Sequence, residues 1–175
     1  MNNKIKVLLS EEQVDARIAE LGAQISKEYE GEEIFMICTL KGACFFACEL
    51  AKRITVPVAL DFMSVSSYGN SSVSSGKIIM KKDIEESIVG KNVIVVEDIV
   101  DTGRTLSYLM DNLKQRGPKS LKLCAMLDKP DRRVVDIKAD YTGFEIPDLF
   151  VIGYGLDYAQ RYRNLPYIGV LEVEE

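Results

Sequence analysis

The stretch from Asn92 to Leu127 constrains the fold most, because it contains a complete strand–helix–strand pattern. Asn92–Val96 is a short apolar run rich in β-branched residues and predicts a core strand. Thr105–Arg116 has the apolar spacing of an amphipathic helix, and Gly117-Pro118 after it is a strong stop signal. Ser120–Leu127 then predicts a second strand. Two strands joined by a helix favour a right-handed crossover and parallel neighbours in one sheet.

The same alternation continues on both sides of this unit. Apolar residues at helical spacing follow Ser10, which suits an N-cap, and they predict a helix over Glu11–Tyr29. A second helix is expected over Ala43–Arg53, ending before Pro57. The remaining predicted strands are Ile34–Leu40, Val58–Val65, Leu149–Tyr154 and Ile168–Val173, and Lys77–Lys81 is a candidate to pair beside Val58–Val65. Residues 1–175 are therefore expected to form a single α/β domain, with a mainly parallel twisted sheet flanked by helices.

The chain has no histidine among its 175 residues. This excludes a Ser-His-Asp triad, a Cys-His dyad and any histidine-based metal site. Acid–base chemistry must then use Asp, Glu, Lys, Tyr or Cys, and a metal would be a hard cation on carboxylates, such as Mg²⁺. The four cysteines form no CxxC pair and are expected to be buried, reduced thiols.

Charge and hydropathy limit the partners of the chain. A net charge of −5 argues against non-specific nucleic-acid binding, which needs a basic face. No apolar stretch approaches the length that crosses a bilayer, and the segment MNNKIKVLLS lacks the pattern of a signal peptide. We therefore expect a cytoplasmic protein that binds neither nucleic acid nor membranes.

Polar residues follow the predicted strand Asn92–Val96, at the edge of the sheet where parallel α/β proteins bind ligands. Glu97 and Asp98 come first, and the loop Asp101–Thr105 then leads into a helix. Its backbone N–H groups, two hydroxyls and glycine suit an anion at a helix N-terminus, although the P-loop spacing is absent. The carboxylates suit sugar hydroxyls or a metal, so a ribose 5-phosphate would satisfy every part. A simple capped helix after a solvated acidic turn is the structural alternative.

The string VIVVEDIVDTGRTL, residues 93–106, strongly resembles the 5-phosphoribosyl-diphosphate motif of type I phosphoribosyltransferases. From the first helix to the C-terminus the chain is similar to bacterial hypoxanthine or hypoxanthine-guanine phosphoribosyltransferases, because several separated motifs agree in order. The resemblance implies the type I fold, with a small hood from about residues 1–10 and 130–175. It also implies Mg²⁺ as the cofactor, 5-phosphoribosyl diphosphate and a 6-oxopurine as substrates, and a homodimer or homotetramer.

The resemblance gives the residues of this string their roles. Glu97 and Asp98 would bind the ribose hydroxyls, directly or through Mg²⁺. Asp101 would be the catalytic general base, close to N7 of the purine. The residues wrapping the 5′-phosphate would be Asp101, Thr102, Gly103, Arg104 and Thr105, with Arg104 acting through its backbone more than its side chain.

A loop after the predicted strand Ile34–Leu40 also matches the family. Leu40, Lys41 and Gly42 resemble the diphosphate-binding loop, which implies a cis peptide bond between Leu40 and Lys41. The freed amides and Lys41 would face the diphosphate. Arg163 matches an arginine that binds the same group, so Lys41, Gly42 and Arg163 form the implied diphosphate site.

The segment Ser66–Gly76 is rich in Ser and Gly. On composition alone it is either a flexible connection or a lid over a site. Ser67 and Tyr68 within it resemble the family's mobile loop, which favours the lid. A lid is chemically useful here, because an exposed ribosyl cation-like species would react with water.

The purine site is implied by matches nearer the C-terminus. Lys129 would donate to O6 of the base. A lysine can donate to a carbonyl oxygen but cannot accept from a 6-amino group, which favours hypoxanthine and guanine over adenine. Phe150 would stack on the purine ring, and the backbone of Val151 would contact its edge. Asp157 would lie near the base and position a second Mg²⁺.

The implied reaction is purine salvage, in which the 5-phosphoribosyl group moves to N9 of hypoxanthine, and of guanine, giving IMP or GMP and diphosphate. Xanthine-guanine transfer on the same scaffold is the first alternative. An RNA-binding regulator of the pyrimidine-operon type has the same motif, but this chain lacks an evident basic stripe. A diphosphokinase that makes the ribosyl donor ranks last, because such chains are usually longer and have two domains.

Overall fold

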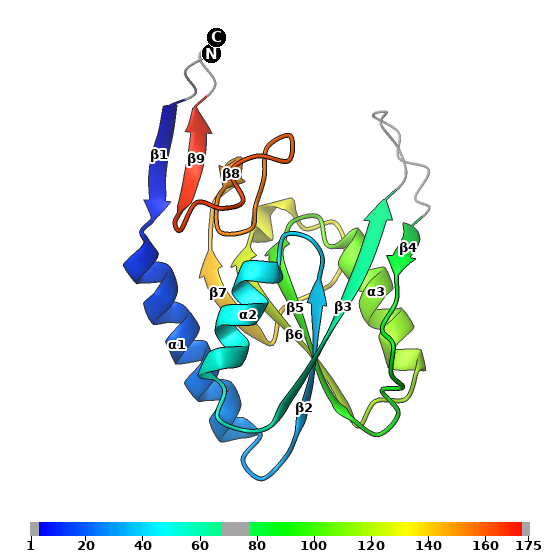
Figure 1. The fold of residues 1–175 in the computed structure, drawn as a ribbon. Helices are drawn as coiled ribbons and strands as arrows, with labels where there is room; N and C mark the ends of the chain where they lie inside the picture. The colour runs from blue at the N-terminus through cyan, green and yellow to red at the C-terminus, as the bar shows by residue number, and fades with distance from the viewer. Residues whose placement is uncertain (1–3, 68–77, 173–175) are drawn as a thin grey trace.

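The structure is a computed structural model, and it describes residues 4–67 and 78–172. Its largest element is a central β-sheet (Figure 1). Its strands are β2 (Ile34–Thr39), β3 (Val58–Ser67), β4 (Ile78–Lys82), β5 (Asn92–Val100), β6 (Ser120–Asp128) and β7 (Tyr141–Glu145). Within the described residues these six strands lie in the order β4-β3-β2-β5-β6-β7. Every neighbouring pair is parallel except β3 with β4. The expected mainly parallel sheet is therefore confirmed.

A smaller antiparallel sheet is formed by β1 (Lys4–Leu9), β9 (Ile168–Glu172) and β8 (Val151–Ile152), in that order. Figure 1 shows it at the end of the molecule toward which the arrows of β2 and β3 point. Its strands come from both terminal parts of the chain, as expected for the hood. The expected hood range needs one correction, because β7 lies within it but belongs to the main sheet.

Helices cover the main sheet on both faces (Figure 1). α1 (Glu11–Glu28) and α2 (Cys44–Arg53) pack on one face, and α3 (Arg104–Gln115) packs on the other. Val93–Val96 in β5 alternate between these two layers: the first and third join the cluster of α3, and the second and fourth join the cluster of α1 and α2. Burial on both faces is typical of parallel strands, and it fixes the end of β5 between two packed layers.

The helix predictions are close to the observed helices. Ser10 caps α1 as expected: the Gln13 N–H donates to Ser10 Oγ at 3.3 Å, and the Ser10 N–H donates to Gln13 Oε1 at 2.9 Å. This reciprocal capping box satisfies two amides that the helix itself leaves unpaired. No helix in the described part of the chain is long and apolar enough to span a membrane.

Three strand predictions need correction. β5 continues to Val100, so Glu97 and Asp98 (the acidic pair) lie within the strand and not after it. The expected strand Leu149–Tyr154 shrinks to Val151–Ile152. The pattern also misses β7, because Gly143 interrupts its apolar run; a Cβ at Gly143 would lie 2.3 Å from the Met126 carbonyl oxygen, and only glycine permits this close approach.

The cysteine prediction holds for two of the four residues. Cys38 and Cys124 are buried, and burial raises the pKa of both thiols. Cys44 is half-buried and Cys48 is exposed, so the expectation was wrong for this pair. α2 turns Phe46 into the core, while Cys44 packs at the edge of that core and Cys48 faces outward.

Candidate active site

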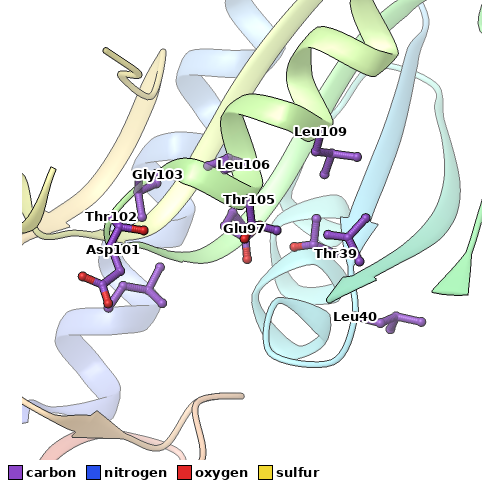
Figure 2. Close-up of a pocket in the computed structure, with 12 residues that line it drawn as sticks. Thr39, Leu40, Glu97, Asp101, Thr102, Gly103, Thr105, Leu106 and Leu109 are labelled. Atoms are coloured by element: carbon purple, nitrogen blue, oxygen red, sulfur yellow. The ribbon is translucent and has the colours of Figure 1, made fainter. Parts of the chain in front are cut away.

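A cavity of about 220 Å³ lies where the carboxyl ends of β2 and β5 meet the start of α3 (Figure 2). Its polar lining consists of Thr39, Glu97, Asp101, Thr102, Gly103 and Thr105. Figure 2 shows the 101–103 loop at one end of the cavity and Thr39 toward the other. This is the sheet edge at which the sequence predicted a ligand, and it gathers most of the residues predicted to bind the ribose and its phosphate.

Gly103 is the N-cap of α3 and adopts the left-handed conformation, with φ +83°. A Cβ on Gly103 would lie 2.6 Å from Ile137 Cγ2, so both the backbone angle and the space require glycine. No side chain caps this helix, so the structural alternative of a simple capped helix is wrong. The first N–H groups of a helix have no partner within it, and here they adjoin the cavity. The site therefore suits a phosphate.

Of the two carboxylates of the acidic pair, only that of Glu97 lines the cavity. Glu97 lines the cavity, and its burial, followed by the neighbouring Asp98 carboxylate, raises its pKa. Asp98 is not part of the cavity wall; its Oδ1 accepts from the Ile99 N–H at 2.8 Å. β5 continues through this pair, and the two carboxylates stay close enough for the Asp98 side chain to contribute to the raised pKa of Glu97.

Two glycines bring three segments into contact beyond the cavity. A Cβ at Gly42 would lie 1.5 Å from Asp98 Oδ2, and a Cβ at Gly155 would lie 1.9 Å from the Gly42 carbonyl oxygen. The end of β5, the loop after β2 and the loop after β8 therefore meet without room for a side chain. The peptide bond between Leu40 and Lys41 is cis, as the resemblance implied.

A polar network joins Lys41 to the loop after β8. Lys41 Nζ donates to Gln160 Oε1 at 3.0 Å, and the Gln160 N–H donates to Asp157 Oδ2 at 2.8 Å. Arg163 pairs with Asp157 at 2.7 Å and donates to the Gly155 carbonyl oxygen at 2.6 Å. Lys41 and Arg163, both predicted to bind the diphosphate, thus share one network. The sequence reasoning did not single out Gln160.

A second network extends from the loop after β6. The Lys129 side chain is only 9% exposed, and its Nζ lies 3.7 Å from Asp148 Oδ1. Arg132 Nη1 lies 3.5 Å from Asp148 Oδ2, and Arg132 Nε donates to Asp101 Oδ1 at 3.1 Å. Arg133 donates to the Asp101 carbonyl oxygen at 2.7 Å. The predicted general base and the predicted O6 donor are therefore connected through residues that the sequence reasoning missed.

Phe150, the residue predicted to stack on the purine, is exposed to solvent. Phe150 precedes β8 and is 55% exposed, whereas Val151 is buried. The Phe150 ring meets Tyr158 edge-on, with ring centroids 5.7 Å apart. An exposed aromatic face beside polar groups can stack on a planar ligand.

The predicted metal ligands do not all come together in the described part of the chain, and one predicted phosphate-binding residue lies outside the cavity. Glu97, Asp98 and Asp157 do not form a single metal-ligand group, since no cluster of three or more such side chains occurs among the described residues. Arg104 also stands outside the cavity wall. The lid prediction falls mostly beyond the described residues: Ser67 ends β3, and Tyr68 lies in the part that is not described.

Comparisons with known proteins agree with this geometry. The family model for the phosphoribosyl transferase domain matches residues 5–159. A hypoxanthine-guanine phosphoribosyltransferase from Bacillus subtilis is 53% identical over 167 residues, which cover 95% of this chain and 93% of that protein. The crystal structure of a hypoxanthine-guanine phosphoribosyltransferase from Bacillus anthracis superposes with a TM-score of 0.92 at 51% identity, covering 97% of this chain and 100% of that one.

Another relative is longer than this chain. The bifunctional protein TilS/HprT of Listeria monocytogenes is 54% identical over 175 residues, which are 99% of this chain but 27% of the relative. The chain therefore spans about a quarter of the length of such bifunctional relatives. The family model, the full-length relatives and the shared fold agree, and the chain belongs to the phosphoribosyl transferase domain family.

Proposed function

We propose that this chain is a purine-salvage enzyme that transfers the 5-phosphoribosyl group from 5-phosphoribosyl diphosphate to N9 of hypoxanthine or guanine. The products are IMP or GMP and diphosphate. The observation that carries the proposal is the cavity at the start of α3, where Glu97 and Asp101 flank the free amides of a helix N-terminus. The name of the Bacillus subtilis relative supports the choice of base.

The ribose 5-phosphate occupies this cavity in the proposed complex. Its phosphate accepts from the loop Thr102–Thr105, where the helix dipole favours negative charge. Glu97 accepts a hydrogen bond from a ribose hydroxyl, or would help to hold a metal ion that coordinates that hydroxyl. Apolar residues of β3, β5 and α3, together with Leu40 after β2, form the remaining walls and limit the access of water.

The leaving diphosphate lies toward the Lys41 network. Lys41 donates a hydrogen bond to the neutral amide oxygen of Gln160, so its charge is available to an anion. Arg163 stands in the same network and adds a second cation. As the C1′–O bond breaks, its electron pair goes to the diphosphate oxygen, and the two cations stabilise the charge that develops there.

Proton transfer falls to Asp101. The lone pair of N9 forms the new bond to C1′, and the purine loses the proton on N7 to the Asp101 carboxylate. Lys129 donates to O6 of the same base, which selects a 6-oxopurine against a 6-aminopurine. Phe150 stacks on the ring from its exposed position, with Val151 at the edge.

Mg²⁺ suits the acidic pair at the end of β5. This ion binds one or two carboxylates together with substrate oxygens, so Glu97 and Asp98 would hold it without a third protein ligand. When bound, it would neutralise charge on the diphosphate. Asp157 is proposed for a second Mg²⁺, although its carboxylate already pairs with Arg163. The homodimer or homotetramer and the cytoplasmic location implied by the family stay predictions.

A spectrophotometric assay with Mg²⁺ and 5-phosphoribosyl diphosphate tests the proposal against hypoxanthine, guanine, xanthine and adenine in turn. We expect transfer to hypoxanthine and guanine and none to adenine. Xanthine used as fast as guanine would favour the xanthine-guanine alternative. No transfer to any of these bases, together with tight and salt-dependent binding of structured RNA to a filter, would favour the regulator.

A further inference from the structure

Asp101 and Lys129 stand at the two ends of a chain of ion pairs, in the order Lys129–Asp148–Arg132–Asp101. The proposed function, on which this inference rests, uses only the two end residues. We propose that Asp148 and Arg132 are positioning residues, which hold Lys129 and Asp101 apart at the spacing that O6 and N7 of a 6-oxopurine require.

The opposite charges of Lys129 and Asp101 explain why positioning residues are needed. Lys129 and Asp101 carry opposite charges and act on neighbouring polar atoms of one base edge, so they attract each other in an empty site. A direct pair would occupy both the donor for O6 and the acceptor for N7. Among the described residues no such pair forms, because Lys129 is paired with Asp148 and Asp101 with Arg132.

The main chain gives this network a fixed frame. The Lys129 N–H donates to the Val100 carbonyl oxygen at 3.0 Å, which ties the loop after β6 to the end of β5. The Val134 N–H donates to the Thr102 carbonyl oxygen at 3.1 Å, and the Ile146 N–H donates to the Asp128 carbonyl oxygen at 2.9 Å. The segments that bear all four charged residues are thus joined by backbone bonds, and the spacing at the base edge depends on the side chains.

Burial decides which link matters most. The Lys129 side chain is almost enclosed, and a buried ammonium group needs an anionic partner. Asp148 is the only carboxylate within salt-bridge distance of Lys129 among the described residues. Asp148 and Arg132 are themselves about half exposed, at 53% and 47%, so their pair adds little to the stability of the fold. Removing Asp148 should therefore disturb the base site, and it should also lower the stability of the fold, because the enclosed Lys129 then lacks its anionic partner.

The test is steady-state kinetics of Asp148→Asn with hypoxanthine and with the ribosyl donor varied separately. Without Asp148, Lys129 turns toward Asp101 and competes with the base. We expect the KM for hypoxanthine to rise roughly tenfold, while the KM for 5-phosphoribosyl diphosphate stays within about twofold. Asp148→Glu restores the charge and should recover most of the affinity for the base. Arg132→Gln, which frees Asp101 from the other side, should also raise the KM for hypoxanthine selectively.

Asp83→Asn is the matched control, because Asp83 forms a comparably exposed ion pair with Arg116 outside the site. It should leave both KM values unchanged. If the wild type is active, three results would overturn the positioning role. The two KM values of Asp148→Asn could change equally, neither could change, or Asp83→Asn could show the same selective change. A wild-type chain inactive with every 6-oxopurine would overturn the proposed function, and the positioning role with it. Thermal unfolding shows whether each variant is folded. If Asp148→Glu is folded but does not restore the affinity for the base, this would also count against the positioning role.

Discussion

The Asp98 carboxylate lies directly against the backbone of Gly42, where a Cβ would come within 1.5 Å of Asp98 Oδ2. Gly42→Ala must therefore displace either Asp98 or the loop after β2. We expect the KM for 5-phosphoribosyl diphosphate to rise at least about tenfold, with a smaller effect on the KM for hypoxanthine. Gly90→Ala serves as the control for a glycine replacement outside the site: its φ of +71° makes alanine cost some stability, but a Cβ there meets no atom within 4 Å, so the donor kinetics should not change. Unchanged donor kinetics in Gly42→Ala would contradict a diphosphate role for this loop.

Asp101 is the residue proposed to take the N7 proton. Asp101→Ala should lower kcat by about 10²–10⁴, the usual contribution of a general base, and leave the KM for the donor largely unchanged. Steady-state rates at saturating substrates measure this directly. Asp111→Asn, an exposed carboxylate on α3, should keep wild-type turnover. A loss of donor affinity with normal turnover in Asp101→Ala would assign Asp101 to binding and not to proton transfer.

Gln160 connects Lys41 with Asp157 and so with Arg163. Gln160→Leu keeps the bulk of the side chain but removes its hydrogen bond to Lys41. A hydrogen bond to a charged group contributes about 1.5–3 kcal/mol, and solvent exposure reduces this, so we expect the KM for the donor to rise about fivefold. The KM for hypoxanthine should not change. Gln115→Leu, at the exposed end of α3, is the control; a similar donor effect there would remove the special role of Gln160.

Glu28 accepts hydrogen bonds from Lys122 and from the Tyr141 hydroxyl. Lys122 first, and then Tyr141, lower the pKa of Glu28 below its ordinary value of 4.5. A lowered carboxyl pKa stabilises the folded state above the unfolded pKa, and this contribution is lost as the pH falls through the folded pKa. The free energy of unfolding of the wild type should exceed that of Glu28→Gln by up to about 1 kcal/mol near neutral pH.

Urea unfolding of both proteins across the acid range checks this dependence. The difference in unfolding free energy should shrink as the pH falls below the ordinary value of 4.5, because the unfolded state then takes up a proton on Glu28, and it should vanish below the lowered folded pKa, where both states are protonated. Glu30→Gln, an exposed neighbour, should show no such dependence. A difference that grows toward acid pH would mean that the hydrogen bonds to Glu28 do not favour its charged form.

Apolar periodicity was enough to find the layers of the fold. Thr105–Arg116 was expected to be helical and Arg104–Gln115 is, because the spacing of buried residues reports directly on the face that packs. The ligand end of the sheet followed from strand order alone, and the residues after Val96 do surround the cavity. Periodicity failed at Gly143, where the need for close backbone approach replaced an apolar side chain.

The polar networks could not be predicted in the same way. Ala159, Gln160 and Tyr162 have φ values of +51°, +65° and +74°, and no glycine marks this turn in the sequence. Arg132 and Asp148 belong to different loops, and they meet only because β6 and β7 are neighbours in the sheet. Contacts of this kind depend on the finished fold, so local sequence patterns carry no signal for them.

The last residues of β5 contribute to two neighbouring places, the cavity and the contact with Gly42. Glu97 faces the cavity and Asp98 faces Gly42, so a slip of β5 by a single residue would exchange the two acids. The pairing of Cys38 with Val96 on one side and of Val96 with Cys124 on the other prevents such a slip. The alignment of three buried strands therefore determines which acid lines the cavity, and core substitutions far from the cavity can change its lining by shifting that alignment.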